Sequence, residues 1–150
     1  MLFRSDLMRN RNSVYLAIAK LCPNLRKLSI LTLTDNDELE TLKVILNNCQ
    51  YLESIGIDGG DESFDVKRIL DILARYSSKN LHELTFFCFS DALSLCLEEF
   101  FINWKDRTSQ KSLSFYAIYY DNMYYINVDM EVIEKYKKLG VIKRFEETHY

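Results

Sequence analysis

A short phrase returns along this chain at nearly constant spacing. The pattern Cys-x-x-Leu-x-x-(Leu/Ile)-x-Ile spans residues 22–30 and again residues 49–57, an offset of 27 residues. A third copy without the cysteine, residues 81–86, follows 29 residues after the second. One unit of this size cannot bury its own apolar face, so consecutive units must stack and cover one another. The repeat therefore restricts the chain to a stacked, repetitive architecture.

The alignment of the copies locates the strands. The second apolar position falls at Leu28, Ile55 and Leu84, and two weaker copies place it at Leu113 and Phe145. Between the copies, apolar residues recur every three or four positions, which indicates helices packed on one side. These stripes are Leu39, Leu42, Ile45, Leu46 and Cys49; Val66, Ile69, Leu70, Leu73 and Tyr76; Leu93, Leu97, Phe100, Phe101 and Trp104; and Met130, Ile133, Tyr136 and Leu139.

Alternating helices and strands predict parallel strands joined by right-handed crossovers. We therefore predict an α/β fold of the leucine-rich-repeat type, a right-handed, ribonuclease-inhibitor-like solenoid. Four to five parallel strands would form its concave face and the helices its convex face. We expect a single domain over residues 1–150, with residues 1–12 as an N-terminal cap or remnant and about residues 13–147 as repeats.

Charge and hydrophobicity along the sequence argue against two classes of partner, nucleic acids and membranes. The formal net charge is −3, whereas nucleic-acid binders usually carry a basic face. The longest strongly apolar run, residues 84–89, is far shorter than the roughly 20 residues of a membrane span. Charged residues near the N-terminus interrupt any signal-peptide apolar region. We therefore expect neither nucleic acid nor membrane as a partner.

The four cysteines carry no metal-binding spacing. No Cys-x-x-Cys pair occurs, and His82 and His149 do not complete a zinc site. Free thiols favour a reducing compartment, so we expect a cytoplasmic or nuclear protein. Cys22 and Cys49 occupy equivalent positions of two copies, where a disulfide is geometrically possible. Burial of both as free thiols is the preferred interpretation, because cysteine is small and often buried.

Residues 21–28 (Leu-Cys-Pro-Asn-Leu-Arg-Lys-Leu) and 48–55 (Asn-Cys-Gln-Tyr-Leu-Glu-Ser-Ile) resemble the cysteine-containing leucine-rich repeats of fungal F-box-like proteins. The resemblance covers about residues 13–147. It implies a substrate receptor of a cullin-RING ubiquitin ligase, in which an F-box binds the adaptor Skp1 and the repeats bind the substrate. No F-box is found in this sequence, so Skp1 binding by this chain is not expected.

The residues flanking the buried strand positions should point to the opposite face of the sheet. They form three rows on this alignment: Lys27, Ser54, Glu83, Ser112 and Arg144; Ser29, Gly56, Thr85, Ser114 and Glu146; and Leu31, Asp58, Phe87, Tyr116 and Thr148. The small middle row would let a partner backbone approach, and adjacent aromatic residues of the third row would anchor it. The alternative is that these aromatic side chains cover each other or lie under a terminal segment. The predicted protein-binding residues are Ser29, Leu31, Asp58, Thr85, Phe87, Ser114 and Tyr116.

The sequence gives little indication of catalysis. The sequence has no Gly-x-Ser-x-Gly elbow, no phosphate-binding loop and no His-Glu-x-x-His motif. The acidic residues at 35–40 are explained by the start of a helix, where negative charge is favourable. We therefore expect a non-catalytic interaction module without cofactor or metal. The alternative is a truncated or remnant repeat fragment with no independent binding activity.

Overall fold

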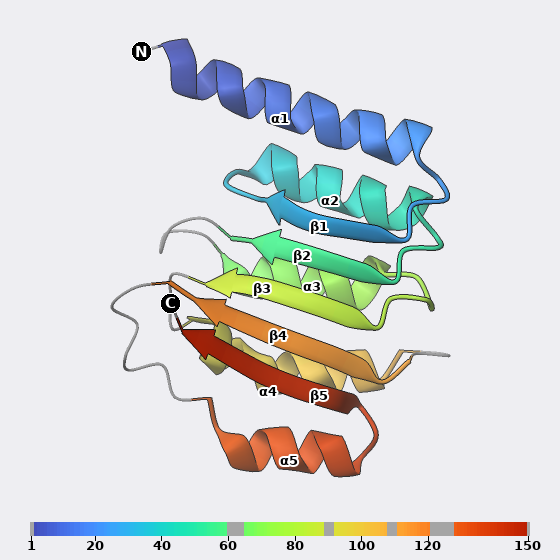
Figure 1. Ribbon diagram of the computed structural model, residues 1–150, viewed down its shortest axis with the longest axis vertical. Helices are drawn as coiled ribbons and strands as arrows, with labels where there is room; N and C mark the ends of the chain where they lie inside the picture. Colours follow the sequence, from blue (N-terminus) through green and yellow to red (C-terminus); the bar gives the residue numbers. More distant parts are fainter. Residues whose placement is uncertain (1, 60–64, 89–91, 108–110, 121–127, 150) are drawn as a thin grey trace.

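A computed structural model describes residues 2–59, 65–88, 92–107, 111–120 and 128–149 (Figure 1). Helices and strands alternate throughout these residues. The helices are α1 (Leu2–Leu21), α2 (Asn36–Asn48), α3 (Val66–Tyr76), α4 (Ala92–Lys105) and α5 (Met130–Lys138). The strands are β1 (Lys27–Thr32), β2 (Ser54–Asp58), β3 (Glu83–Cys88), β4 (Leu113–Tyr119) and β5 (Ile142–His149). The predicted α/β alternation is confirmed.

All the strands belong to one parallel sheet in the order β1-β2-β3-β4-β5, which is also their order in the chain. Figure 1 shows α2, α3 and α4 behind the strands, with α1 and α5 at the two ends of the molecule. The other face of the sheet carries no helix in this view. The sheet therefore has a covered face and a helix-free face.

Helix boundaries follow local sequence signals. The Asp35 carboxylate accepts a hydrogen bond from the backbone N–H of Glu38 at 2.8 Å and caps α2. Asp129 caps α5 in the same way through the N–H of Glu131. Gly140 follows the last residues of α5 with a φ of 76°, a left-handed conformation that glycine adopts without steric cost. The helix start predicted at the acidic residues 35–40 is confirmed.

The core lies between the covered face of the sheet and the helices. Ile55 and Ile57 of β2 and Leu84 and Phe86 of β3 are buried there, among the apolar stripes of α2, α3 and α4. In the C-terminal half of the chain the core is rich in aromatic side chains. The predicted core position of Trp104 is confirmed by its burial. The Trp104 indole N–H also donates to the Lys111 carbonyl at 3.1 Å, so its polar atom is satisfied.

The predicted alignment of β4 is wrong by two residues. Leu84 of β3 lies opposite Phe115, not opposite Leu113, and Phe115 in turn lies opposite Phe145 of β5. Leu113, Phe115 and Ala117 are all buried, so the same alternation permits either alignment. A shift of two residues keeps every side chain on its face of the sheet. It changes which residues are neighbours across strands.

The predicted alignment of β1 fails for a different reason. Leu28 pairs with Ile55 but Leu31 pairs with Ile57, so two residues of β1, Ser29 and Ile30, stand opposite the single residue between Ile55 and Ile57. This β-bulge reverses the alternation. Leu31 is completely buried, while Ile30 is 54% exposed. The expectation that Leu31 lines the exposed face is therefore wrong.

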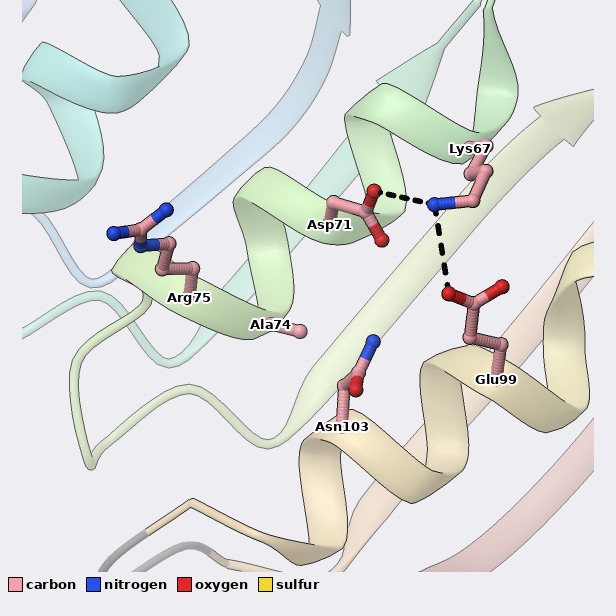
Figure 2. Close-up of a pocket in the computed structure, with 6 residues that line it drawn as sticks. All are labelled: Lys67, Asp71, Ala74, Arg75, Glu99 and Asn103. Carbon is pink, nitrogen blue, oxygen red and sulfur yellow. Dashed lines mark hydrogen bonds and ion pairs between the residues drawn. The ribbon is translucent and has the colours of Figure 1, made fainter.

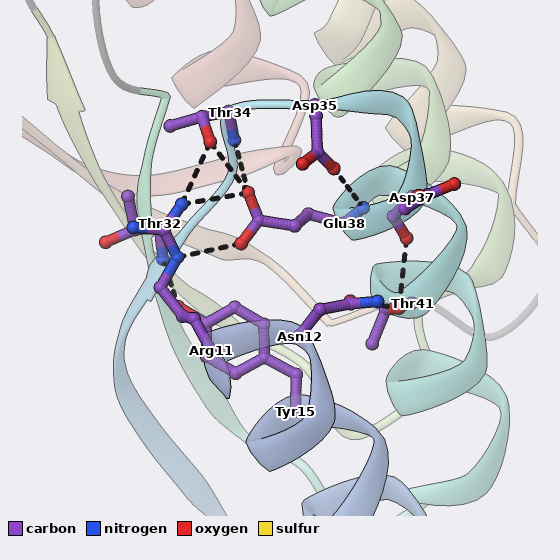
Figure 3. Close-up of polar contacts among 9 residues, drawn as sticks. All are labelled: Arg11, Asn12, Tyr15, Thr32, Thr34, Asp35, Asp37, Glu38 and Thr41. Carbon is purple, nitrogen blue, oxygen red and sulfur yellow. Dashed lines mark hydrogen bonds and ion pairs between the residues drawn. The ribbon is translucent and has the colours of Figure 1, made fainter. Parts of the chain in front are cut away.

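The first helix closes the β1 edge of the sheet (Figure 3). The Tyr15 hydroxyl of α1 accepts a hydrogen bond from the backbone N–H of Thr32 in β1 at 3.0 Å. Beside it, Arg11 holds the Glu38 carboxylate with two hydrogen bonds of 2.8 and 3.0 Å. Thr34 donates to the same carboxylate from its N–H and its hydroxyl. These contacts fix α1 against α2 and the edge strand.

Electrostatics explain why a charge is tolerated at Glu38, whose side chain is fully buried. Burial alone would raise the pKa of the Glu38 carboxyl, but the hydrogen bonds from Arg11 and Thr34 outweigh it and hold that pKa below its ordinary value. The bond to Glu38 likewise raises the pKa of Arg11. The pair is ionised and satisfied, as buried charges must be.

The repeated cysteine position links adjacent units. The Cys49 thiol donates to the carbonyl oxygen of Cys22 at 3.4 Å. One unit further, the Asn80 amide donates to the carbonyl of Gln50 at 2.9 Å. Both cysteines are free, with Cys49 buried and Cys22 exposed. Burial is thus confirmed for Cys49 and wrong for Cys22.

Candidate interaction surface

The helix-free face of the sheet presents three rows of side chains, each running across the strands. The observed register groups them as Lys27, Ser54, Glu83, Ser114 and Arg144; Ser29 with Ile30, Gly56, Thr85, Tyr116 and Glu146; and Thr32, Asp58, Phe87, Ile118 and Thr148. Small or polar side chains occupy most of β1 and β2. The larger apolar side chains lie on β3 and β4, apart from Ile30 of the bulge.

Phe87 is the centre of an aromatic group on this face. Its ring stacks on that of Tyr120, with centroids 6.1 Å apart and planes at 18°. Its Cε2 atom lies 3.6 Å from the point where a β-carbon of Gly56 would stand. Phe87 is consequently half-buried by its own chain, and intramolecular packing accounts for part of its environment.

The predicted binding residues take different positions. Asp58, Thr85, Phe87, Ser114 and Tyr116 are half-buried and lie in the rows of the helix-free face. Ser29 is exposed in the β1 bulge, and Leu31 lies in the core.

Cross-strand neighbours differ from the prediction. Tyr116 lies opposite Thr85, and Phe87 lies opposite Ile118, so the expected Phe87–Tyr116 pair across the strands does not form. Ser114 lies opposite Glu83. These differences all follow from the shifted register of β4.

Sequence reasoning missed two apolar side chains of this surface. Ile118 is half-buried between Phe87 and Thr148 in the register, and Ile30 is exposed by the bulge. The alternation Leu113-x-Phe115-x-Ala117 gives the correct face for Ile118. It would have found this residue once the strand was extended to Tyr119. No local signal marks Ile30, because the bulge is a property of the strand pair.

Two polar contacts of the described residues lie on this face. Ser54 donates its hydroxyl to the Glu83 carboxylate at 3.0 Å. Arg144 and Glu146 stand 3.8 Å apart along β5, with both side chains more than half exposed, so this ion pair contributes little to stability. The face therefore offers half-exposed apolar groups with separate positive and negative side chains around them.

A hollow lies on the helix side of the molecule, between α3 and α4 (Figure 2). It encloses about 440 Å³ and is lined by Lys67, Asp71, Ala74, Arg75, Glu99 and Asn103. The Lys67 ammonium group is 2.9 Å from Asp71 and 3.5 Å from Glu99. The lysine therefore already has two carboxylate partners from the two helices. This arrangement supports the packing of α3 on α4.

Within the described part of the chain, no group of three or more His, Cys, Asp or Glu side chains is placed to hold a metal ion. No helix among these residues is both long and apolar enough to cross a membrane. Searches against protein-family models, curated proteins and solved structures give no match for this chain.

Proposed function

We propose that this chain is a leucine-rich-repeat solenoid that acts as a non-catalytic protein-binding module. The repeated phrase, the chain-order parallel sheet and the helices on one face all support this class of fold. The proposed compartment is the cytoplasm or nucleus, in keeping with the free thiols of Cys22, Cys49 and Cys96. The resemblance to F-box-like repeats suggests a receptor role in which this region would contact the substrate.

One observation carries the proposal: the helix-free face leaves Tyr116 and Ile118 half-exposed beside the Phe87–Tyr120 stack. Aromatic side chains with a polar surround are typical anchors of protein interfaces, and Ile118 adds apolar surface beside them. Thr85 and Ser114 beside them are small enough to admit a partner's main chain. We assign the centre of the binding surface to Thr85, Tyr116 and Ile118.

The test is site-specific photo-crosslinking in cells. A photoreactive amino acid in place of Tyr116 should capture one defined protein. The same amino acid in place of Leu95, which is 82% exposed on α4, should not capture that protein. The captured protein, once purified, should bind the wild-type chain and bind the Tyr116→Ala/Ile118→Ala variant at least about tenfold more weakly.

Equal capture from both positions, or binding that is unchanged by the double substitution, would refute this surface. Absence of any captured protein at Tyr116 would favour the remnant-fragment alternative. Thermal unfolding of each variant serves as the folding control.

A further inference from the structure

The two edges of the sheet are not alike. At the β1 edge, the Tyr15 hydroxyl accepts a hydrogen bond from the N–H of Thr32. At the other edge, β4 is the only strand of the described residues that pairs with β5. From Lys143 to His149 every side chain of β5 is exposed except that of Phe145, which is half-buried. Unpaired strand edges present a row of backbone donors and acceptors that can pair with another strand.

The charges along β5 have a self-complementary order. The sequence from 143 to 147 is Lys-Arg-Phe-Glu-Glu, with two positive residues before Phe145 and two negative residues after it. An antiparallel copy of the same strand, centred on Phe145, places Arg144 opposite Glu146 twice. Lys143 lies in an irregularity of β5, between Ile142 and Arg144 in the register with β4, and adds positive charge near Glu147 of the other copy. A parallel copy in register would place like charges side by side instead. Opposite charges across strands are favourable and like charges are unfavourable.

We propose that β5 pairs with β5 of a second copy of this chain, antiparallel and with the two-fold axis at Phe145. This surface is distinct from the helix-free face, and the proposal does not depend on the proposed function. The interface is isologous, because the same strand contributes to both sides. The Phe145 ring, stacked on Phe115 at 5.7 Å, then meets its own symmetry mate at the centre of the seam.

The register is selected by charge and by side-chain direction together. A shift of one residue would oppose side chains that belong to different faces of the sheet. A shift of two residues would place Arg144 opposite Arg144, or Glu146 opposite Glu146. Only the pairing centred on Phe145 keeps the faces aligned and opposes unlike charges. In the single chain Arg144 and Glu146 are 3.8 Å apart and solvent-exposed, so they can exchange this weak contact for cross-strand partners.

Charge reversal provides the test, read by sedimentation equilibrium and native mass spectrometry over a range of concentrations. Wild-type chain should form a dimer. Arg144→Glu alone opposes two acidic residues twice, and Glu146→Arg alone opposes two basic residues twice, so each should weaken dimerisation about tenfold or more. Lys27→Glu, at an exposed position of β1, is the matched control and should leave dimerisation unchanged.

Two further samples separate the interface from any effect on folding. The double variant Arg144→Glu/Glu146→Arg carries both reversals in one chain, restores unlike pairs between the two copies and should recover the dimer. A mixture of the two single variants should form a heterodimer more tightly than either variant forms a homodimer. A wild-type chain that stays monomeric up to millimolar concentration would overturn the proposal. So would a dimer that ignores both reversals, or single variants whose mixture does not associate.

Discussion

The carbonyl oxygen of Ser29 lies directly over Gly56, 1.9 Å from the point where a β-carbon on residue 56 would stand. The bulge in β1 pushes this carbonyl into the space that a side chain on β2 would need. The backbone of Gly56 is not in the left-handed region, so the glycine is required for space alone. The small middle row predicted as an approach for a partner is, at this position, occupied by the chain's own backbone.

Gly56→Ala should destabilise the fold strongly, because the new methyl group meets a main-chain atom that cannot rotate away. We expect a loss of about 2 to 3 kcal/mol in the free energy of unfolding, measured by urea denaturation, as for other overpacked sites. Gly59→Ala is the control, since a β-carbon there meets only side-chain atoms of Ile69 and Phe86 at 3.7 Å or more. Similar losses for both variants would mean that the bulge does not constrain Gly56.

Arg11→Ala should weaken the packing of α1 against α2 and β1. The substitution leaves the fully buried Glu38 carboxylate without its cation, which costs about 3 to 5 kcal/mol at a buried pair. Arg11→Ala/Glu38→Gln should recover part of this loss, because no buried charge then remains. Hydrogen exchange should show faster exchange over α1 in the single variant than in the double variant. Equal exchange in the two variants would contradict the assigned role of the pair.

The lowered pKa of Glu38 predicts acid sensitivity of a definite sign. Because the carboxyl binds its proton less readily in the folded chain than in the unfolded chain, its contribution to stability is present above its unfolded pKa of about 4.5 and is lost as the pH falls through the folded value. The urea midpoint of the wild-type chain should therefore fall in acid more steeply than that of Glu38→Gln. Glu40→Gln, on the same helix with its side chain 61% exposed, should follow the wild-type curve.

Thiol labelling should distinguish the two cysteines of the repeated phrase. Cys22 is exposed, whereas Cys49 is buried, donates to the Cys22 carbonyl and has a pKa raised mainly by burial. Since the thiolate is the reactive form, iodoacetamide should modify Cys22 quickly and Cys49 only on unfolding, as followed by peptide mass spectrometry. Modification of Cys49 at the rate of Cys22 in the native chain would show that its position is accessible.

The sequence was sufficient for the order of elements, because period-two strands and three-four-spaced helices leave separate patterns. It could not settle the register of β4, where Leu113, Phe115 and Ala117 are equally suited to the core. In β1, Leu28 and Ile30 satisfy one alternation while Leu31 and Leu33 satisfy the other. The choice between them depends on how β1 pairs with β2, which no local pattern records.

The sequence predicted which face of the sheet carries most of the candidate residues. It did not predict which of these residues lie opposite one another across the strands. Thr85, Phe87 and Tyr116 lie on the helix-free face as expected, but the partners of each across the strands depend on the register of β4. The ion pair between Arg11 and Glu38 joins residues 27 positions apart. The acidic cluster could be recognised as a helix start, yet nothing in its spacing identifies which carboxylate turns inward to meet an arginine of the preceding helix.

The hydrogen bond from Thr32 to the Tyr15 hydroxyl makes the β1 edge of the sheet different from the β5 edge. At the β1 edge the Thr32 N–H is already bonded to the chain's own helix, whereas β5 is the edge at which the proposed dimer adds a strand. A sheet with one edge available for pairing with a second copy forms a dimer and stops there, because the dimer leaves no such edge for a third copy. A sheet with both ends free could instead lengthen without limit, as fibrils do. In the proposed dimer, Tyr15 would therefore help to limit assembly to two copies, although it lies at the opposite edge of the sheet from β5.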